Sequence, residues 1–176
     1  MANKRISKSK RALILGLLVE GNTINGICRV LSVGKVSVLR FLNECGEACE
    51  DWHNRHFRGI DISSLQLDEQ WAYCGKHKER MNREEKLNNP EMGDIWLWAG
   101  IDPKSKAIIS WRTGKRDART AKSLANDLAN RVDGDVQIDT DQLKAYVPAI
   151  RRAFGDRASH AQVVKQFRNS LKPDPM

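Results

Sequence analysis

The strongest structural signal in this chain comes from two short runs, Ser64-Leu65-Gln66-Leu67-Asp68-Glu69-Gln70-Trp71 and Asp135-Val136-Gln137-Ile138-Asp139-Thr140-Asp141. Both place apolar residues at alternating positions, which predicts buried β-strands. Asp68 belongs to the first run and Asp141 to the second. Two carboxylates that two strands bring to one place repel each other unless a cation lies between them. The pair therefore predicts a site for Mg²⁺ or Mn²⁺ that would take part in catalysis.

The apolar period is 2 around these runs, and further elements follow in a defined order. Residues 95–101 are apolar on both faces, which is typical of a central strand. The expected elements are strands at 65–74, 95–101 and 107–113, a helix from 117 or 120 to 132, a strand at 136–140, a helix at 146–154 and a short strand at 161–164. This α/β order is that of the ribonuclease H-like fold, a mixed sheet flanked by helices, in which the first and fourth strands are neighbours.

The N-terminal part has helical periodicity instead. Apolar residues recur at helical spacing over 7–20, 23–31 and 35–45, and Ser32-Val33-Gly34 forms a tight turn between the second and third segments. This arrangement predicts a helix-turn-helix. Its third helix would enter the DNA major groove. The residues expected to contact DNA are Arg29, Lys35, Ser37 and Arg40. A three-helix packing module that binds no DNA is the alternative.

Charge is unevenly distributed and supports a polyanionic partner. The chain has 176 residues and a formal net charge of +8. Residues 1–42 contain eight Lys or Arg and one acid, Glu20, a local charge of +7. Double-stranded DNA is the partner that this excess favours. No uncharged apolar run reaches the length of a transmembrane helix, so we expect a cytoplasmic protein without a membrane partner.

The change of period divides the chain into two predicted domains. We expect a helix-turn-helix domain at 1–50, a polar linker at 51–62 and a sheet domain at 63–176. Between the first two strands, residues 75–94 are long and rich in Lys and Arg. This segment is either a solvated loop or a basic hairpin tip that touches a DNA backbone.

Several motifs in this order resemble the transposases of the first-described bacterial insertion sequence family, a branch of the DDE transposases. They are Leu67-Asp68-Glu69-Gln70-Trp71, Ile95-Trp96-Leu97-Trp98-Ala99-Gly100-Ile101-Asp102, Arg119-Thr120-Ala121, Thr140-Asp141-Gln142-Leu143-Lys144-Ala145-Tyr146 and Gln162-Val163-Val164-Lys165. The resemblance implies an insertion-sequence transposase that binds transposon ends, as a homo-oligomer on DNA, and performs metal-dependent DNA cleavage and strand transfer. It further implies that Asp68 and Asp141 are the first two catalytic metal ligands.

Two neighbouring acids complicate this assignment. Asp139 competes with Asp141, because residues two apart in a strand point to the same face. The Thr-Asp-x-x-x-Ala-Tyr setting is that of the family, so the resemblance favours Asp141. By the same rule Glu69 points away from Asp68. We expect Glu69 to pair with a nearby Lys or Arg.

The chain departs from the family in its third acid. The family's last catalytic acid lies on a helix beyond the strand around Val163, and no convincing counterpart precedes Met176. Asp174, between two prolines, is a poor substitute. We therefore expect an incomplete sheet domain that is inactive by itself as an enzyme. A non-catalytic regulator of transposition or a helix-turn-helix transcription factor is the alternative, and a nuclease completed by substrate or a partner subunit is a third possibility.

The cysteines have no secretory context, so we expect free thiols. Cys45, Cys49 and His53 recur at i, i+4 and i+8, with His56 nearby. They are either metal ligands or a buried-thiol helix face that runs into a polar segment, and the paired spacing of a zinc ribbon is missing from the sequence.

Overall fold

The computed structural model describes residues 6–164, and this part of the chain divides into two compact units between His56 and Phe57. Asp174, considered above as a possible third acid, lies outside the described residues. None of the helices in residues 6–164 combines the length and apolar character that a membrane crossing requires.

The N-terminal unit consists of three helices, α1 (Lys8–Val19), α2 (Ile24–Leu31) and α3 (Lys35–His56). Side chains cap the first two, because Ser7 Oγ accepts a hydrogen bond from Lys10 N and Thr23 Oγ1 accepts one from Gly26 N. One buried residue from each helix forms the centre of the core: Ile14, Ile27 and Val38. The predicted three-helix arrangement therefore has its own small core.

The third helix is longer than expected. It continues for 22 residues to His56, so the residues predicted as the start of a linker are helical. Its polar second half contains no proline, and in the last turn the positive charge of Arg55 stabilises the carboxyl end of the helix dipole. Polarity made this segment resemble a linker, but polarity alone does not end a helix.

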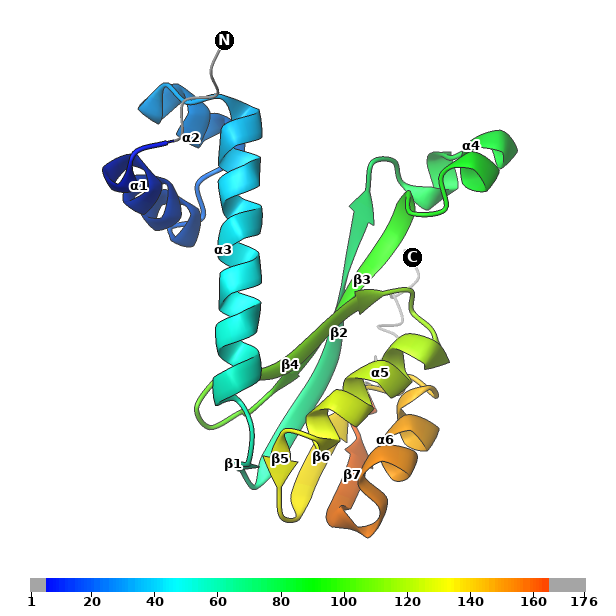
Figure 1. Ribbon diagram of the computed structural model, residues 1–176. Helices are drawn as coiled ribbons and strands as arrows, with labels where there is room; N and C mark the ends of the chain where they lie inside the picture. The colour runs from blue at the N-terminus through cyan, green and yellow to red at the C-terminus, as the bar shows by residue number, and fades with distance from the viewer. Residues whose placement is uncertain (1–5, 165–176) are drawn as a thin grey trace, which may run out of the picture. The chain divides into compact units, whose positions relative to one another are not determined.

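The second unit is a mixed five-stranded sheet with the order β4-β3-β2-β6-β7 (Figure 1). The strands are β2 (Ser64–Cys74), β3 (Gly93–Ile101), β4 (Ile108–Gly114), β6 (Val136–Thr140) and β7 (Ala158–Gln162). β2, β3 and β4 form an antiparallel meander, whereas β6 is parallel to both β2 and β7. The first and fourth strands of this sheet are therefore neighbours, as the sequence predicts.

Helices α5 (Ala118–Ala129) and α6 (Tyr146–Phe154) lie together over one face of the sheet (Figure 1). Asp117 caps α5 by accepting from Thr120 N. The core beneath them includes Leu65, Leu67, Trp98, Leu124, Leu128, Ile138 and Ile150, all nearly inaccessible to solvent. At Gly100 the helix approaches so closely that a Cβ would lie 2.8 Å from a Leu128 methyl carbon. We call the side covered by α5 and α6 the helix face and the other the open face.

Short elements escaped the sequence analysis. β1 (Ile60–Asp61) lies inside the segment predicted as linker, and it pairs in parallel with β5 (Val132–Asp133). Two-residue strands are too short to show a period. The segment expected as a loop between β2 and β3 contains a 3₁₀ turn, η1 (Lys78–Arg80), and helix α4 (Arg83–Asn88), which a capping box of Asn82 and Glu85 stabilises. A second 3₁₀ turn, η2 (Gly155–Arg157), precedes β7.

Candidate functional site

The sheet brings the two predicted aspartates to adjacent positions. β2 and β6 are parallel neighbours, with Leu67 aligned to Thr140. Asp68 follows Leu67, and Asp141 follows Thr140. The two acids therefore occupy corresponding positions at one point of the sheet, where β6 ends and β2 continues.

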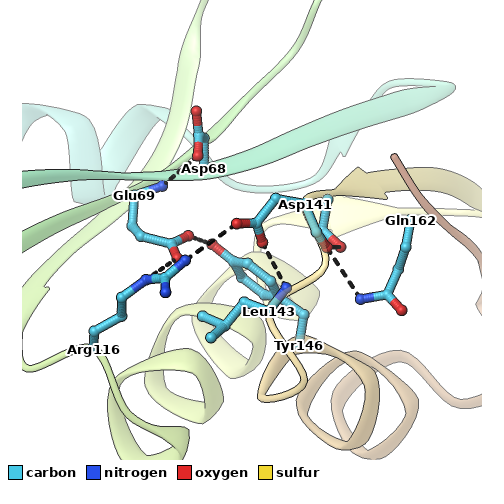
Figure 2. A network of polar contacts seen from close by, with 8 residues as sticks. Asp68, Glu69, Arg116, Asp141, Leu143, Tyr146 and Gln162 are labelled. Carbon is cyan, nitrogen blue, oxygen red and sulfur yellow. Dashed lines mark hydrogen bonds and ion pairs between the residues drawn. The ribbon is translucent and has the colours of Figure 1, made fainter. Parts of the chain in front are cut away.

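Their side chains nevertheless differ in direction. Leu67 is buried on the helix face, so the next residue, Asp68, lies on the open face and is exposed. Its Oδ1 accepts a hydrogen bond from Glu69 N at 2.9 Å. Figure 2 shows the Asp68 carboxylate directed away from the labelled groups around Asp141.

Asp141 lies just after the strand, and its carboxylate takes part in two polar contacts. Its Oδ1 accepts from Leu143 N at 2.8 Å, which fixes the turn before α6. Its Oδ2 is 3.2 Å from Arg116 Nη2 in an ion pair (Figure 2). The Asp141 side chain remains 36% exposed, so its carboxylate is held in place but accessible.

Glu69 lies at the centre of this polar network, on the helix face. Its side chain is only 1% exposed, and its Oε1 is 2.7 Å from Arg116 Nε. The Tyr146 hydroxyl donates to Glu69 Oε2 at 2.7 Å. One guanidinium thus bridges Glu69 and Asp141, and a buried carboxylate holds that guanidinium in place (Figure 2). The expected basic partner of Glu69 is therefore Arg116.

The same surroundings keep Tyr146 in its hydroxyl form. Burial raises the pKa of Tyr146, and the hydrogen bond to Glu69 and the charges of Glu69, Asp141 and Asp68 add to that effect. A neutral hydroxyl is the form that donates to Glu69. Tyr146 is thus a fixed donor that orients the Glu69 carboxylate.

Asp139 differs from Asp141 in its placement. It pairs in register with Gln66 on the open face, the face of Asp68, and its Oδ1 accepts from Gln137 Nε2 at 3.0 Å. The expectation that Asp139 and Asp141 share a face is wrong, because β6 ends at Thr140 and Asp141 lies in the turn that follows. The open face therefore presents Asp68 and Asp139, whereas Asp141 contacts Arg116 of the network on the helix face.

The described residues do not fit a complete metal site. No group of three or more His, Cys, Asp or Glu within residues 6–164 is arranged to hold a metal ion. Asp68 and Asp141 point in different directions, and Arg116 already neutralises Asp141. As arranged, the pair offers two separate oxygen donors, and Mg²⁺ or Mn²⁺ would require Asp141 to leave Arg116.

The candidate metal ligands on α3 are Cys45, Cys49, His53 and His56, and within residues 6–164 they too form no group of three that is arranged to hold a metal ion. Cys45 is half-buried, and burial, followed by the neighbouring Cys49 and Glu44, raises the pKa of its thiol. A raised pKa disfavours the thiolate that binds metals. His53 is buried, whereas the His56 ring stacks on Trp52 with centroids 4.4 Å apart.

The residues predicted to contact DNA lie on the surface of the N-terminal unit. Lys35 is the first residue of α3, and Arg40 lies between its first and second turns from the same end. Both side chains are exposed, as is Arg29 on α2, whereas Ser37 is half-buried. The turn before α3 has its left-handed residue at Ser32 (φ 51°) and not at Gly34.

Sequence reasoning missed Arg116, the residue that joins the two acids. It lies between β4 and α5, 47 residues from Glu69 and 25 from Asp141. Its motif-free setting, Lys115-Arg116-Asp117, gave no signal.

Searches against known protein families and against curated proteins found no match to this chain.

Proposed function

We propose that this chain is a DNA-binding protein of the insertion-sequence transposase class. In this proposal the three helices form a helix-turn-helix that recognises DNA ends, and the second unit is a ribonuclease H-like core. The supporting observation is the strand order β4-β3-β2-β6-β7, with Asp68 on β2 at the position that corresponds to Asp141, directly after the neighbouring parallel strand β6. Strand order alone occurs with many functions, so the acids carry the argument.

The first unit supports the DNA-binding part through its charge. Exposed cations lie at the start of α3 and on α2, and Lys and Arg contacts to phosphates provide most of the affinity for duplex DNA. Base contacts from the amino-terminal residues of α3 would add sequence preference. We expect more than one copy of the chain to bind each DNA end.

The test is an electrophoretic shift assay with duplexes that carry the repeats flanking the gene, compared with random duplex of equal length. We expect preference for the repeats and a steep loss of affinity as salt rises. Replacing Arg29, Lys35 and Arg40 with Ala should weaken binding, and each lost phosphate contact should reduce the salt slope by about 1. Lys122→Ala, on α5 of the other unit, is the matched control. No preference for the repeats would contradict the proposal.

A non-catalytic regulator is the second candidate, and the Arg116–Asp141 ion pair favours it. The buried Glu69 carboxylate holds the Arg116 guanidinium in place, and Asp141, which pairs with that guanidinium, is poorly available to a metal ion. Calorimetric titration with Mn²⁺ distinguishes a metal-dependent enzyme from a non-catalytic regulator. Binding that Asp141→Ala abolishes supports the enzyme, whereas absence of binding in the wild type, with intact DNA recognition, supports the regulator.

A further inference from the structure

The outer half of the β2–β3 hairpin carries a cluster of exposed aromatic rings. Trp71 is 40% exposed and Tyr73 is 55% exposed, although both are large apolar side chains. His77 completes the cluster, with its ring centroid 4.9 Å from that of Trp71 and 5.8 Å from that of Tyr73. In Figure 1 this hairpin extends beyond α5 and α6 and ends in α4. The three rings contact one another, and those of Trp71 and Tyr73 remain open to solvent.

The cluster continues the same face of the sheet as the polar network. Glu69 pairs with Trp98, and Trp71 pairs with Trp96, so these residues follow one another on the helix face. The Arg116 guanidinium lies over the Trp96 ring, 5.1 Å from its centroid. A strip of rings therefore leads outward from the network of Glu69, Arg116 and Asp141.

A groove of about 700 Å³ borders this strip. Trp96 and Arg116 line it, together with three lysines and three acids: Lys78, Lys86, Lys115, Glu91, Asp94 and Asp117. Within residues 6–164, none of the three lysine ammonium groups lies within 4.0 Å of a carboxylate. Rings and lysines that form no ion pair thus occur side by side, and the four cations of the groove exceed its three acids by one.

We propose that this aromatic strip and its groove bind the unpaired bases of a single DNA strand next to the candidate site. The inference rests on the proposed function, because it gives that function a second DNA contact. Unpaired bases expose both faces and stack on aromatic side chains, whereas the phosphates between them attract Lys and Arg. Paired bases in a duplex are already stacked and present only their edges to a protein.

The occupant is a nucleic-acid strand because the surface has both kinds of contact at once. An apolar protein partner would use the rings, but it would leave three ammonium groups and Arg116 facing apolar surface, at a desolvation cost. A purely electrostatic duplex contact would use the cations and leave Trp71 and Tyr73 exposed. A single strand uses both sets.

Fluorescence titration of the intrinsic tryptophans with a thymidine strand of about 16 nucleotides tests the inference. Wild type should bind the strand with quenching of emission. The double variant Trp71→Ala/Tyr73→Ala should bind it about tenfold or more weakly when measured by anisotropy of a labelled strand, because stacking on each ring is lost. Leu97→Ala is the matched control, since Leu97 is 39% exposed on β3 of the same hairpin but on the open face. It should bind the strand as wild type does.

Charge reversal provides a second variant that leaves the rings intact. Lys86→Glu/Lys115→Glu should weaken strand binding and reduce its salt dependence. Unchanged affinity in both double variants, or a loss of affinity in Leu97→Ala equal to that in the ring variant, would overturn the inference. So would self-association of the wild type that the ring variant abolishes while strand binding persists.

Failure of this inference is separable from failure of the proposed function. The ring variant should bind repeat-containing duplex as tightly as wild type, because that binding is assigned to the cations of α2 and α3. Strand binding without duplex preference would overturn the proposed function and support the strip. Duplex preference with no strand binding would do the reverse.

Discussion

The β2–β3 hairpin places tryptophans on one face of one sheet in opposite surroundings. At its inner end Trp98 is completely buried, and its ring meets that of Tyr146 edge-on, with centroids 5.5 Å apart. At its outer end Trp71 is 40% exposed. The strand pairing is continuous between them, so the difference arises from the helices that cover only the inner end. The inner end stabilises the fold, and the outer end is available to a ligand.

The largest effect should separate these two tryptophans. Trp98→Ala should lower the free energy of unfolding by about 3–5 kcal/mol, since it removes a buried ring and leaves a cavity. Trp71→Ala should change it by about 0.5 kcal/mol or less, as for other surface substitutions. Urea unfolding monitored by circular dichroism measures both. Equal losses would mean that the outer rings form part of the core, which would remove the contrast.

The next effect distinguishes the two faces at the middle of β2. Glu69→Ala should cost about 2–3 kcal/mol, because it leaves Arg116 and the Tyr146 hydroxyl without their shared partner. Asp68→Ala, one residue earlier on the open face, should cost about 0.5 kcal/mol or less. The two variants are compared by urea unfolding at neutral pH. A larger loss of stability in Asp68→Ala than in Glu69→Ala would mean that the carboxylate on the open face stabilises the fold, and would contradict this assignment.

A smaller effect tests how closely α5 packs on the inner end. Gly100→Ala places a Cβ 2.8 and 2.9 Å from the two methyl carbons of Leu128, so we expect a loss of about 1–2 kcal/mol from overpacking. The control is Gly16→Ala in α1, where a Cβ meets nothing within 4 Å. That change should stabilise its own unit by about 1 kcal/mol or less. Differential scanning calorimetry resolves the two directions.

The smallest effect is the dependence of stability on pH, compared for Asp127 near the inner end of the hairpin and Glu85 at its outer end. Burial opposes ionisation of Asp127, but hydrogen bonds from Arg131 and Ser110 and the charge of Arg112 outweigh it and lower its pKa. Stability from this carboxylate is therefore present above the unfolded pKa of Asp and is lost as pH falls through the lower folded pKa. Wild type should lose more stability than Asp127→Asn on acidification, measured by urea unfolding from neutral to acid pH.

Glu85 at the outer end provides the comparison. Its pKa is lowered mainly by the hydrogen bond from Lys76, but the pair is partly exposed to solvent. Glu85→Gln should therefore remove less of the acid sensitivity, and added salt should erase the difference. A greater effect of Glu85→Gln than of Asp127→Asn would contradict the assignment of the buried carboxylate to the inner end.

Periodicity predicted most of the regular elements, although β7 covers Ala158–Gln162 and not 161–164, and α5 ends at Ala129 and not at 132. The strand at 136–140 and the helix at 146–154 occur with the expected bounds, because both show strong apolar patterns and clear ends. Periodicity failed for the second half of α3, where polar residues form a helix, and for the hairpin tip, where α4 is only six residues long. Polar and short segments have too few apolar positions to define a period.

The sequence by itself determined which residues alternate along each strand, and therefore that Asp68 and Glu69 point in opposite directions. It also determined the basic charge of the first helices. Only the tertiary structure decided that Glu69 is buried beside Tyr146, that Arg116 joins it to Asp141, and that Trp71 stays exposed where Trp98 does not. The reason is that alternation is local to the backbone, whereas burial and charge pairing depend on helices and loops that return from distant parts of the chain.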